Sequence, residues 1–383
     1  MTQRRQGGSG RSDRQWRLPI LPSLGLFLAI VLVGVPAFIQ SNNLLMLLLA
    51  VVVAVGITAV IASRLMLTGL TTHRILPRHA EVGQAVRIRY MITNRGKWLP
   101  TFCVGVTDTL PEYAARYDRR AWVMHIGPGD TVHGDAQLVP LRRGRLRFTH
   151  MTMTSTFPYG LLRRRRRIQH EQELVVFPRR YALRGDVLRL VNAEAADGPH
   201  ASRVRGAGQE WYGTRLGRSG DGWRDVAWKA SAHRGQLVAL DRVRPGLPRA
   251  MVLLDLTRPT SELVLPDGVD AQLEEERAIE LAASLLADLH RHGHEVGLTV
   301  ALDDVQSHAI RSGTRHLQRL LGVLADVDLS HQRGTSIAGA AAPRAATIVV
   351  QPDRVRPIES CLGATYLVAR RLEDLRLPDR RSA

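Results

Sequence analysis

The chain has little cysteine, and neither of its two cysteines lies in a metal-binding or redox motif. Its 383 residues include two cysteines, Cys103 and Cys361, far apart and in no CxxC or Cys/His spacing. This excludes a disulfide framework and a cysteine-based metal site. Nothing in the pattern points to an oxidising compartment, and we expect two buried free thiols.

Motifs for several common kinds of chemistry are also missing. The sequence contains no Walker A loop, no HExxH helix and no GxSxG nucleophile elbow. His290, His292 and His294 alternate, but they span an expected helix end at Gly293 and would not converge on one metal ion. A histidine at a helix C-terminus also complements the helix dipole. The sequence thus offers no catalytic residues and predicts a protein that is not an enzyme.

Negative charge is scarce relative to positive charge. There are 53 Lys and Arg residues against 35 Asp and Glu, a net charge of +18, and arginine supplies most of the excess. Such a balance favours polyanionic partners, either an anionic membrane face or nucleic acid. A GC-rich genome would produce the same arginine bias.

Two long uncharged runs lie near the N-terminus. Ile20–Ile39 and Leu44–Ser63 are each long enough to cross a hydrocarbon core, and only residues 40–43 separate them. A connection that short makes the two helices antiparallel neighbours. Arginines precede the first run and follow the second, which puts both termini on the cytoplasmic side. We therefore predict a two-pass hairpin in the cell membrane over residues 1–70, with every later domain cytoplasmic. The alternative is a core hairpin of a soluble protein.

Residues 71–180 have the pattern of a small β-sandwich. Apolar and polar residues alternate over Val86–Thr93 and again over Phe102–Val106, and glycine-containing turns follow at Asn94–Gly96 and Gly127–Asp130. Several short strands with regular turns are typical of two packed antiparallel sheets.

An unbroken basic run lies in this region. It consists of Arg163, Arg164, Arg165, Arg166 and Arg167. Each basic residue near an anionic membrane contributes about 1 kcal/mol of attraction, so the run could contact lipid headgroups. It could equally be a solvated strand edge whose charge blocks edge-to-edge pairing. Specific nucleic-acid binding is not expected, because exposed aromatics for base stacking do not interleave with the arginines.

Residues 248–383 alternate strand and helix patterns. Apolar runs at Ala250–Leu256, Val296–Ala301 and Ala346–Val350 predict buried strands, and Leu273–His292 and Thr314–Asp326 have the periodicity of amphipathic helices. This order predicts βαβ units in a doubly wound α/β sheet. Ligands of such sheets bind at the carboxyl ends of the strands.

A dense signature lies within the segment that joins these regions, residues 181–247. It runs from Gly208 to Asp241 and holds three of the chain's tryptophans, at 211, 223 and 228. Its pattern resembles that of the bacterial DUF58 family, whose signature is close to GxEFxxLRxYxxGDxxRxIDWxxSAR. The matching residues are Gly208, Glu210, Arg215, Gly220, Asp221, Arg224, Trp228, Ser231 and Ala232. Phe157–Leu161 (FPYGL) also resembles the PFGL turn of that family.

The signature also departs from the family pattern. Ala227 stands where the family has the Asp of its IDW triplet, so this chain lacks an acid at that position. Two interpretations remain for the segment. Its tryptophans and ion pairs could be packing anchors, or its exposed arginines and tryptophans could face a partner, since both types are enriched at interface hot spots.

The resemblance implies an architecture and a partner. It implies a membrane hairpin, a β-domain and a von Willebrand A-like, Rossmann-like α/β domain, in a protein that works with a MoxR-type AAA+ ATPase. A von Willebrand A-type metal site has the motif DxSxS. Here Asp255 and Thr257 fill its first two places, whereas Pro259 offers no side-chain oxygen. We therefore expect no cofactor, with Mg²⁺ as the alternative.

The sequence thus predicts a membrane-anchored, non-catalytic adaptor. It would present the α/β domain to the ATPase for maturation or remodelling of client proteins. Two alternatives stay open. One is a metal-dependent hydrolase that uses Asp255 and Asp304, and the other is a basic module that binds lipid or nucleic acid directly.

Overall fold

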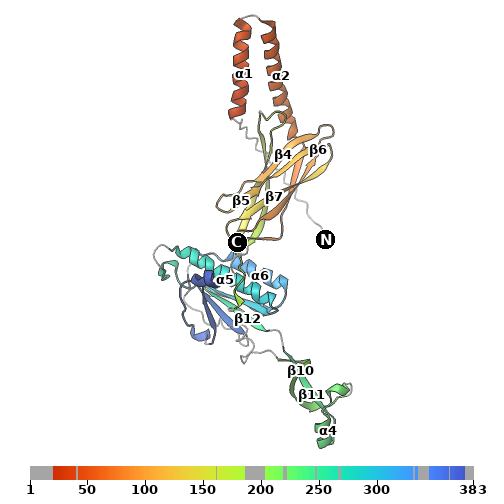
Figure 1. The fold of residues 1–383 in the computed structure, drawn as a ribbon, viewed down its shortest axis with the longest axis vertical. Coiled ribbons are helices and arrows are strands. Elements are labelled where there is room, and N and C mark those ends of the chain that lie inside the picture. The colour runs from red at the N-terminus through yellow and green to blue at the C-terminus, as the bar shows by residue number, and fades with distance from the viewer. Residues whose placement is uncertain are drawn as a thin grey trace. The chain divides into compact units, whose positions relative to one another are not determined.

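The protein forms two compact units. The computed structural model describes residues 20–39, 42–160, 162–185, 203–218, 222–245, 248–265, 269–330, 333–334, 345–361 and 363–375. The first unit is Met1–Phe177, and the second is Pro178–Ala383. The first combines a helical hairpin with two β-sheets, and the second has α/β topology and a separate two-stranded sheet (Figure 1).

Two apolar helices begin the first unit. Helices α1 (Ile20–Ile39) and α2 (Asn43–Met66) lie side by side (Figure 1). Asn42 caps α2, since its side-chain oxygen accepts a hydrogen bond from the backbone NH of Leu44 at 2.9 Å. By length and composition, α2 could cross a membrane, and only 6% of its most apolar stretch is buried. The apolar stretch described for α1 is shorter, Leu24–Ile39.

Nine strands follow and build a β-rich body from two sheets. The first sheet has the order β1-β3-β7-β5, and the second has the order β2-β9-β8-β4-β6. The strands are β1 (Leu70–Ile75), β2 (His79–Glu81), β3 (Val86–Asn94), β4 (Thr101–Asp108), β5 (Ala115–Arg119), β6 (Ala121–Ile126), β7 (Thr131–Pro140), β8 (Gly144–Ser155) and β9 (Arg164–Phe177). Alternate residues of the strands, including Ile88, Tyr90 and Ile92 on β3, are fully buried in one common core. The predicted alternation over Val86–Thr93 is confirmed.

The apolar helix α2 runs into this body with almost no linker. It ends at Met66 and β1 begins at Leu70, while Leu67 and Leu70 are both buried in the core of the sheets. The Arg166 guanidinium on β9 donates hydrogen bonds to the carbonyls of Leu67 and Leu70, both at 3.0 Å. The junction is therefore fixed by packing and by a charged donor.

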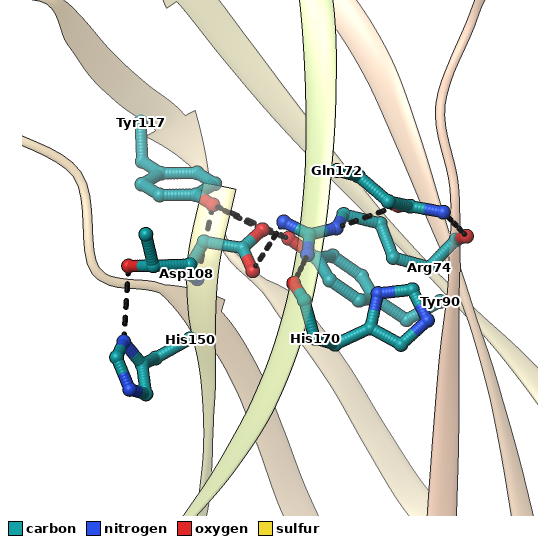
Figure 2. A network of polar contacts seen from close by, with 8 residues as sticks. Arg74, Tyr90, Asp108, Tyr117, His150, His170 and Gln172 are labelled. Atoms are coloured by element: carbon teal, nitrogen blue, oxygen red, sulfur yellow. Dashed lines mark hydrogen bonds and ion pairs between the residues drawn. The ribbon is translucent and has the colours of Figure 1, made fainter. Parts of the chain in front are cut away.

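A buried ion pair connects the two sheets. Arg74, on β1 of the first sheet, lies 3.0 Å from Asp108, on β4 of the second, and neither side chain is exposed (Figure 2). Arg74 also donates to the Gln172 side chain at 3.1 Å and to the carbonyl of His170 at 2.6 Å, both on β9. Its guanidinium further lies 4.5 Å from the centre of the Phe148 ring. One arginine thus contacts three strands of the opposite sheet.

The other partners of Asp108 come from the first sheet. Tyr90 on β3 and Tyr117 on β5 donate hydrogen bonds to the same carboxylate oxygen, at 2.5 and 3.1 Å (Figure 2). Burial raises the pKa of Asp108, and the positive charge of Arg74 opposes this shift. Burial likewise lowers the pKa of Arg74, opposed by Asp108, and raises the pKa of both tyrosines. Every charge of the network is matched by a partner across the sheets.

The second unit contains a mostly parallel five-stranded sheet of order β14-β13-β12-β15-β16. Its elements are β12 (Arg249–Asp255), α5 (Ala271–Arg291), β13 (Glu295–Ala301), β14 (Val305–Arg311), α6 (Thr314–Asp326), β15 (Ala346–Gln351) and β16 (Thr365–Val368). Only β14 is antiparallel to its neighbour. The three predicted strands and two predicted helices are confirmed to within two residues, and β14 and β16 are additions to them.

Helix α5 is the central packing element of this unit. It contacts β12, β13 and β15, and it also contacts segments near the start and the end of the described part of the unit. The backbone NH groups of Tyr181 and Leu183 donate to Ser284 and Asp288 on α5, at 2.9 and 3.1 Å. The NH of Arg184 donates to the carbonyl at the end of α7 (Leu372–Leu375) at 2.8 Å. Residues 181–184, which the sequence assigned to a linker, are thus bonded to the α/β unit.

Both cysteines are free thiols. Cys361 is buried and Cys103 is half-buried. The prediction of burial therefore holds for Cys361 and is wrong for Cys103, which sits on β4 with a positive φ of 52°.

The ion pair between the sheets predicts a large loss of stability when one partner is removed. Arg74→Met would leave Asp108 buried without its positive partner and should lower the free energy of unfolding by about 3–5 kcal/mol. Chemical denaturation of the full chain in a neutral detergent measures this loss. The control is Asp135→Asn, which removes the partially exposed partner of Arg87 and Arg89 and should cost far less. Equal losses of unfolding free energy in the two variants would show that the buried pair stabilises the protein no more than the exposed one.

Candidate functional site

The carboxyl edge of the parallel sheet holds the residues that the sequence singled out for a metal. Asp255 ends β12, and one of its oxygens accepts hydrogen bonds from the NH and the hydroxyl of Thr257, at 3.2 and 2.8 Å. Its other oxygen accepts from the side-chain amide of Gln351, at the end of β15, at 2.8 Å. Both oxygens of Asp255 are therefore engaged with protein donors.

A second acid lies at the same edge and is engaged as well. One oxygen of Asp353 accepts from Arg258 at 2.9 Å, from Arg356 at 3.3 Å and from the NH of Val264 at 3.2 Å. The cavity between Asp255 and Asp353 has a volume of about 10 Å³, which is room for roughly one water molecule. Asp304 does not line this cavity and is exposed in the turn before β14.

These residues do not fit a divalent cation. A hard cation needs several oxygen ligands, but Pro259, at the third place of the motif, supplies none. Arg258 and Arg356 place positive charge beside the cavity. Within the described ranges, no group of three or more His, Cys, Asp or Glu side chains could hold a metal. The edge is instead a closed set of ion pairs and hydrogen bonds.

The three alternating histidines have separate environments. His292 shares a hydrogen bond with the carbonyl of Asp288 at 2.8 Å, at the end of α5. His294 is buried in the turn that follows, and this burial lowers its pKa. The histidines close the helix end, which agrees with the expectation that they do not converge.

The signature segment forms a hairpin. Strands β10 (Arg203–Leu216) and β11 (Val238–Pro245) pair antiparallel, with two irregularities in register. Between them lie a short 3-10 turn η1 (Trp223–Asp225) and helix α4 (Trp228–Arg234). This hairpin was not predicted, because irregular register and several glycines in β10 interrupt the alternation on which strand prediction depends.

Ser231 has a structural role in the hairpin. Its hydroxyl accepts a hydrogen bond from the NH of Val238 at 2.9 Å and contacts the carbonyl of Ala227 at 3.0 Å. The NH of Ala227 in turn donates to the carbonyl of Val238 at 2.8 Å. Helix α4 is thereby fixed to the start of β11.

The remaining signature residues spread along the hairpin. Glu210 pairs with Val243 in the β10–β11 register, and Arg215 lies opposite Ala239 and donates to the carbonyl of Leu216 at 3.1 Å. Arg224 is exposed in η1. Gly220 and Asp221 lie outside the described residues. The structure therefore brings Ser231, Ala227 and Val238 together and does not gather the charged signature residues into one described site.

The two tryptophans near the tip are not packing anchors. Trp223 and Trp228 stack on each other, with ring centres 5.8 Å apart and planes 23° from parallel. Trp223 is 81% exposed and Trp228 is 55% exposed. The packing interpretation of these two residues is wrong, since each finds its main aromatic partner in the other and both stay open to solvent.

The five arginines of the basic run do not all point to the same side of β9. On β9, Arg165 faces outward opposite Thr154, while Arg166 is turned toward the junction of α2 and β1. Arg163 is exposed, and Arg164 and Arg167 are half-buried. The five arginines thus do not form one uniform anionic-surface patch, and period-two alternation was the signal that could have shown this.

The hydrogen bonds of Asp255 and the arginines beside it predict that magnesium does not stabilise the protein. Millimolar Mg²⁺ should not change the melting temperature of the full chain relative to EDTA, because Pro259 supplies no oxygen ligand and two arginines place positive charge beside Asp255. Asp255→Ala should lower that temperature by leaving the Gln351 amide and Thr257 without their acceptor, while Glu262→Ala, at an exposed position nearby, should not. A magnesium-dependent rise that disappears in Asp255→Ala would contradict this interpretation. Differential scanning fluorimetry in detergent supplies the measurement.

Comparison with known proteins gives no family for the chain. No family model matches it, and no curated protein matches it. Among solved structures, part of the chain is similar to alpha-2-macroglobulin of Escherichia coli in three forms. The trypsin-activated form shares 16% identity over 42% of this chain and 9% of its own, with a TM-score of 0.22. The elastase-activated form shares 15% identity over 42% of this chain and 12% of its own, with a TM-score of 0.22. The native form shares 16% identity over 42% of this chain and 8% of its own, with a TM-score of 0.21. The chain covers about a tenth of those proteins, and likenesses this weak carry no argument.

Proposed function

We propose that this chain is a membrane-anchored, non-catalytic adaptor of the DUF58 type. It presents a von Willebrand A-like α/β unit and the β10–β11 hairpin to a MoxR-type AAA+ ATPase, which matures or remodels client proteins. The observation that carries the proposal is the exposed, stacked pair of Trp223 and Trp228. Exposed tryptophans beside basic residues are the residue types on which interface binding energy concentrates.

The surroundings of the tryptophan pair favour a protein partner. Arg224 lies between the two tryptophans in sequence, and Lys229 and Arg234 follow on α4, all exposed. Such a tip combines a rigid apolar contact with several positive charges. It suits an acidic protein surface with a shallow apolar pocket, and a basic surface would be repelled.

The membrane anchor supports a fixed position for the adaptor. On the two-pass topology, α1 and α2 cross the cell membrane and both termini lie in the cytoplasm. The clamp of Arg166 on the junction of α2 and β1 would then hold the β-rich unit directly at the membrane face. A cytoplasmic ATPase could reach the adaptor there without a further targeting signal.

The chemistry of the α/β unit supports a role without catalysis. Both oxygens of Asp255 accept hydrogen bonds from Thr257 and Gln351, which ties this carboxylate into the structure of the sheet edge. The hydrolase alternative also requires Asp304, which does not line the cavity at Asp255. We therefore favour binding over hydrolysis.

The tryptophan pair makes the proposal testable in membranes. The double variant Trp223→Ala/Trp228→Ala should reduce the amount of AAA+ ATPase that co-purifies with the full chain by about tenfold or more. The matched control is Trp98→Ala, which removes a tryptophan that is 88% exposed in the first unit and should leave recovery unchanged. Quantitative mass spectrometry of gently solubilised membranes measures both. Repeated absence of any AAA+ protein from the wild-type sample, or equal recovery from the double variant and the control, would refute the proposal.

A further inference from the structure

The outer face of the second sheet of the β-rich unit carries a pocket of about 320 Å³. This volume is at the lower end of the range for small-molecule sites. Its lining residues lie on or next to β4, β6, β8 and β9, with Tyr117 added from β5. Three threonines, Thr107, Thr152 and Thr154, and three arginines, Arg120, Arg163 and Arg165, line it together with Trp122.

A glycine on β4 makes room for the pocket's aromatic wall. Gly105 pairs with Trp122 on β6 and with Thr154 on β8. A Cβ at Gly105 would lie 2.7 Å from the Trp122 ring and 2.9 Å from the Thr154 hydroxyl, closer than real contacts allow. The indole can therefore lie across the strand. Trp122 nevertheless remains 49% exposed, so its free surface is available to a ligand.

The register places the polar groups side by side. Thr107 pairs with Thr152, and Thr154 pairs with both Gly105 and Arg165 across the sheet. Because side chains alternate between the faces of a strand, these positions share the outer face. The hydroxyls and the guanidinium of Arg165 thus surround one common space.

The charge of the pocket has no counterion in the described part of the chain. The side chains of Arg120, Arg163 and Arg165 make no ion pair or hydrogen bond with any residue that the structure describes. Asp108 also lines the pocket, but Arg74 neutralises it and both tyrosines donate to it from inside the core. The pocket therefore keeps an excess of positive charge and offers hydroxyl donors, which is the chemistry that binds phosphate.

The pocket lies at the end of the β-rich unit that receives α2. Arg165 precedes Arg166, whose side chain bonds the carbonyls of Leu67 and Leu70 just beyond the helix. Adjacent residues of a strand are only about 3.3 Å apart along its axis. On the two-pass topology, the arginines would stand close to the layer of cytoplasmic headgroups.

We propose that this pocket binds one phosphate-bearing group, held by Arg120, Arg163 and Arg165 and bordered by the indole of Trp122. A phosphodiester lipid headgroup and a free phosphate share this chemistry. A single strand of nucleic acid would need a longer track of aromatics and cations than the pocket supplies. The inference does not depend on the ATPase partner, so it and the adaptor role can fail separately.

The test uses the full chain in a maltoside detergent. Isothermal titration calorimetry would measure binding of short-chain phosphatidylglycerol, of short-chain phosphatidylcholine and of inorganic phosphate. The variant Arg163→Gln/Arg165→Gln should weaken binding of phosphatidylglycerol by about tenfold or more, because two charge-assisted contacts are lost. The control Arg116→Gln/Arg119→Gln removes the same charge from two exposed arginines on β5 that do not line the pocket, and should change affinity less than about twofold.

A second variant separates the pocket from general surface charge. Thr154→Leu keeps every charge but fills the space beside Gly105, and it should also weaken binding by about tenfold. Tighter binding of phosphatidylglycerol than of inorganic phosphate would identify a lipid source, and equal binding a free anion; both outcomes support a phosphate site. Absence of binding, equal losses in the two double-arginine variants, or tighter binding of a short oligonucleotide would overturn the proposal.

Discussion

The β-rich unit depends on the ion pair between Arg74 and Asp108. Burying two charges costs several kcal/mol each, and the mutual attraction offsets this only when every remaining donor and acceptor is also satisfied. Tyr90, Tyr117, Gln172 and the carbonyl of His170 meet that condition, and they do so from both sheets. The pair therefore links the two sheets through groups that come from both of them. Arg74 also lies on β1, the strand into which α2 runs, so the apolar helix and the sheet interface share one element.

Charged side chains are paired in some parts of the molecule and exposed in others. Inside the sheets, Arg74 neutralises Asp108. At the carboxyl edge of the α/β unit, two arginines neutralise Asp353, and Asp255 accepts a hydrogen bond from the Gln351 amide. The outward arginines near the start of β9 keep their charge and face a pocket with threonines and an indole. At the hairpin tip, exposed basic residues accompany the stacked tryptophans. The two proposals use this distribution, with an anionic group at the β-rich unit and a protein partner at the hairpin.

Regular elements followed from the sequence, and interactions between distant residues did not. Helix α6 was predicted at its observed bounds, because its leucines repeat with helical period and nothing competes with that signal. Arg74 and Asp108 lie 34 positions apart on different sheets, and no local pattern marks such a pair. For Trp223 and Trp228 the sequence left two interpretations open, packing or contact with a partner, because no local pattern shows how much of a tryptophan is buried. In the structure they stack on each other and remain exposed. The pocket needed Gly105, Trp122 and Arg165 in register across four strands, which only the sheet topology provides.

The central claim is that the hairpin tip contacts an AAA+ ATPase at the membrane. The most direct measurement is photo-crosslinking in native membranes from a photoreactive residue at position 223, compared with one at position 98. The account predicts a crosslink to an AAA+ ATPase from position 223 that is absent from position 98. A tip that crosslinks only to other proteins, or an ATPase that crosslinks equally from both positions, would contradict it.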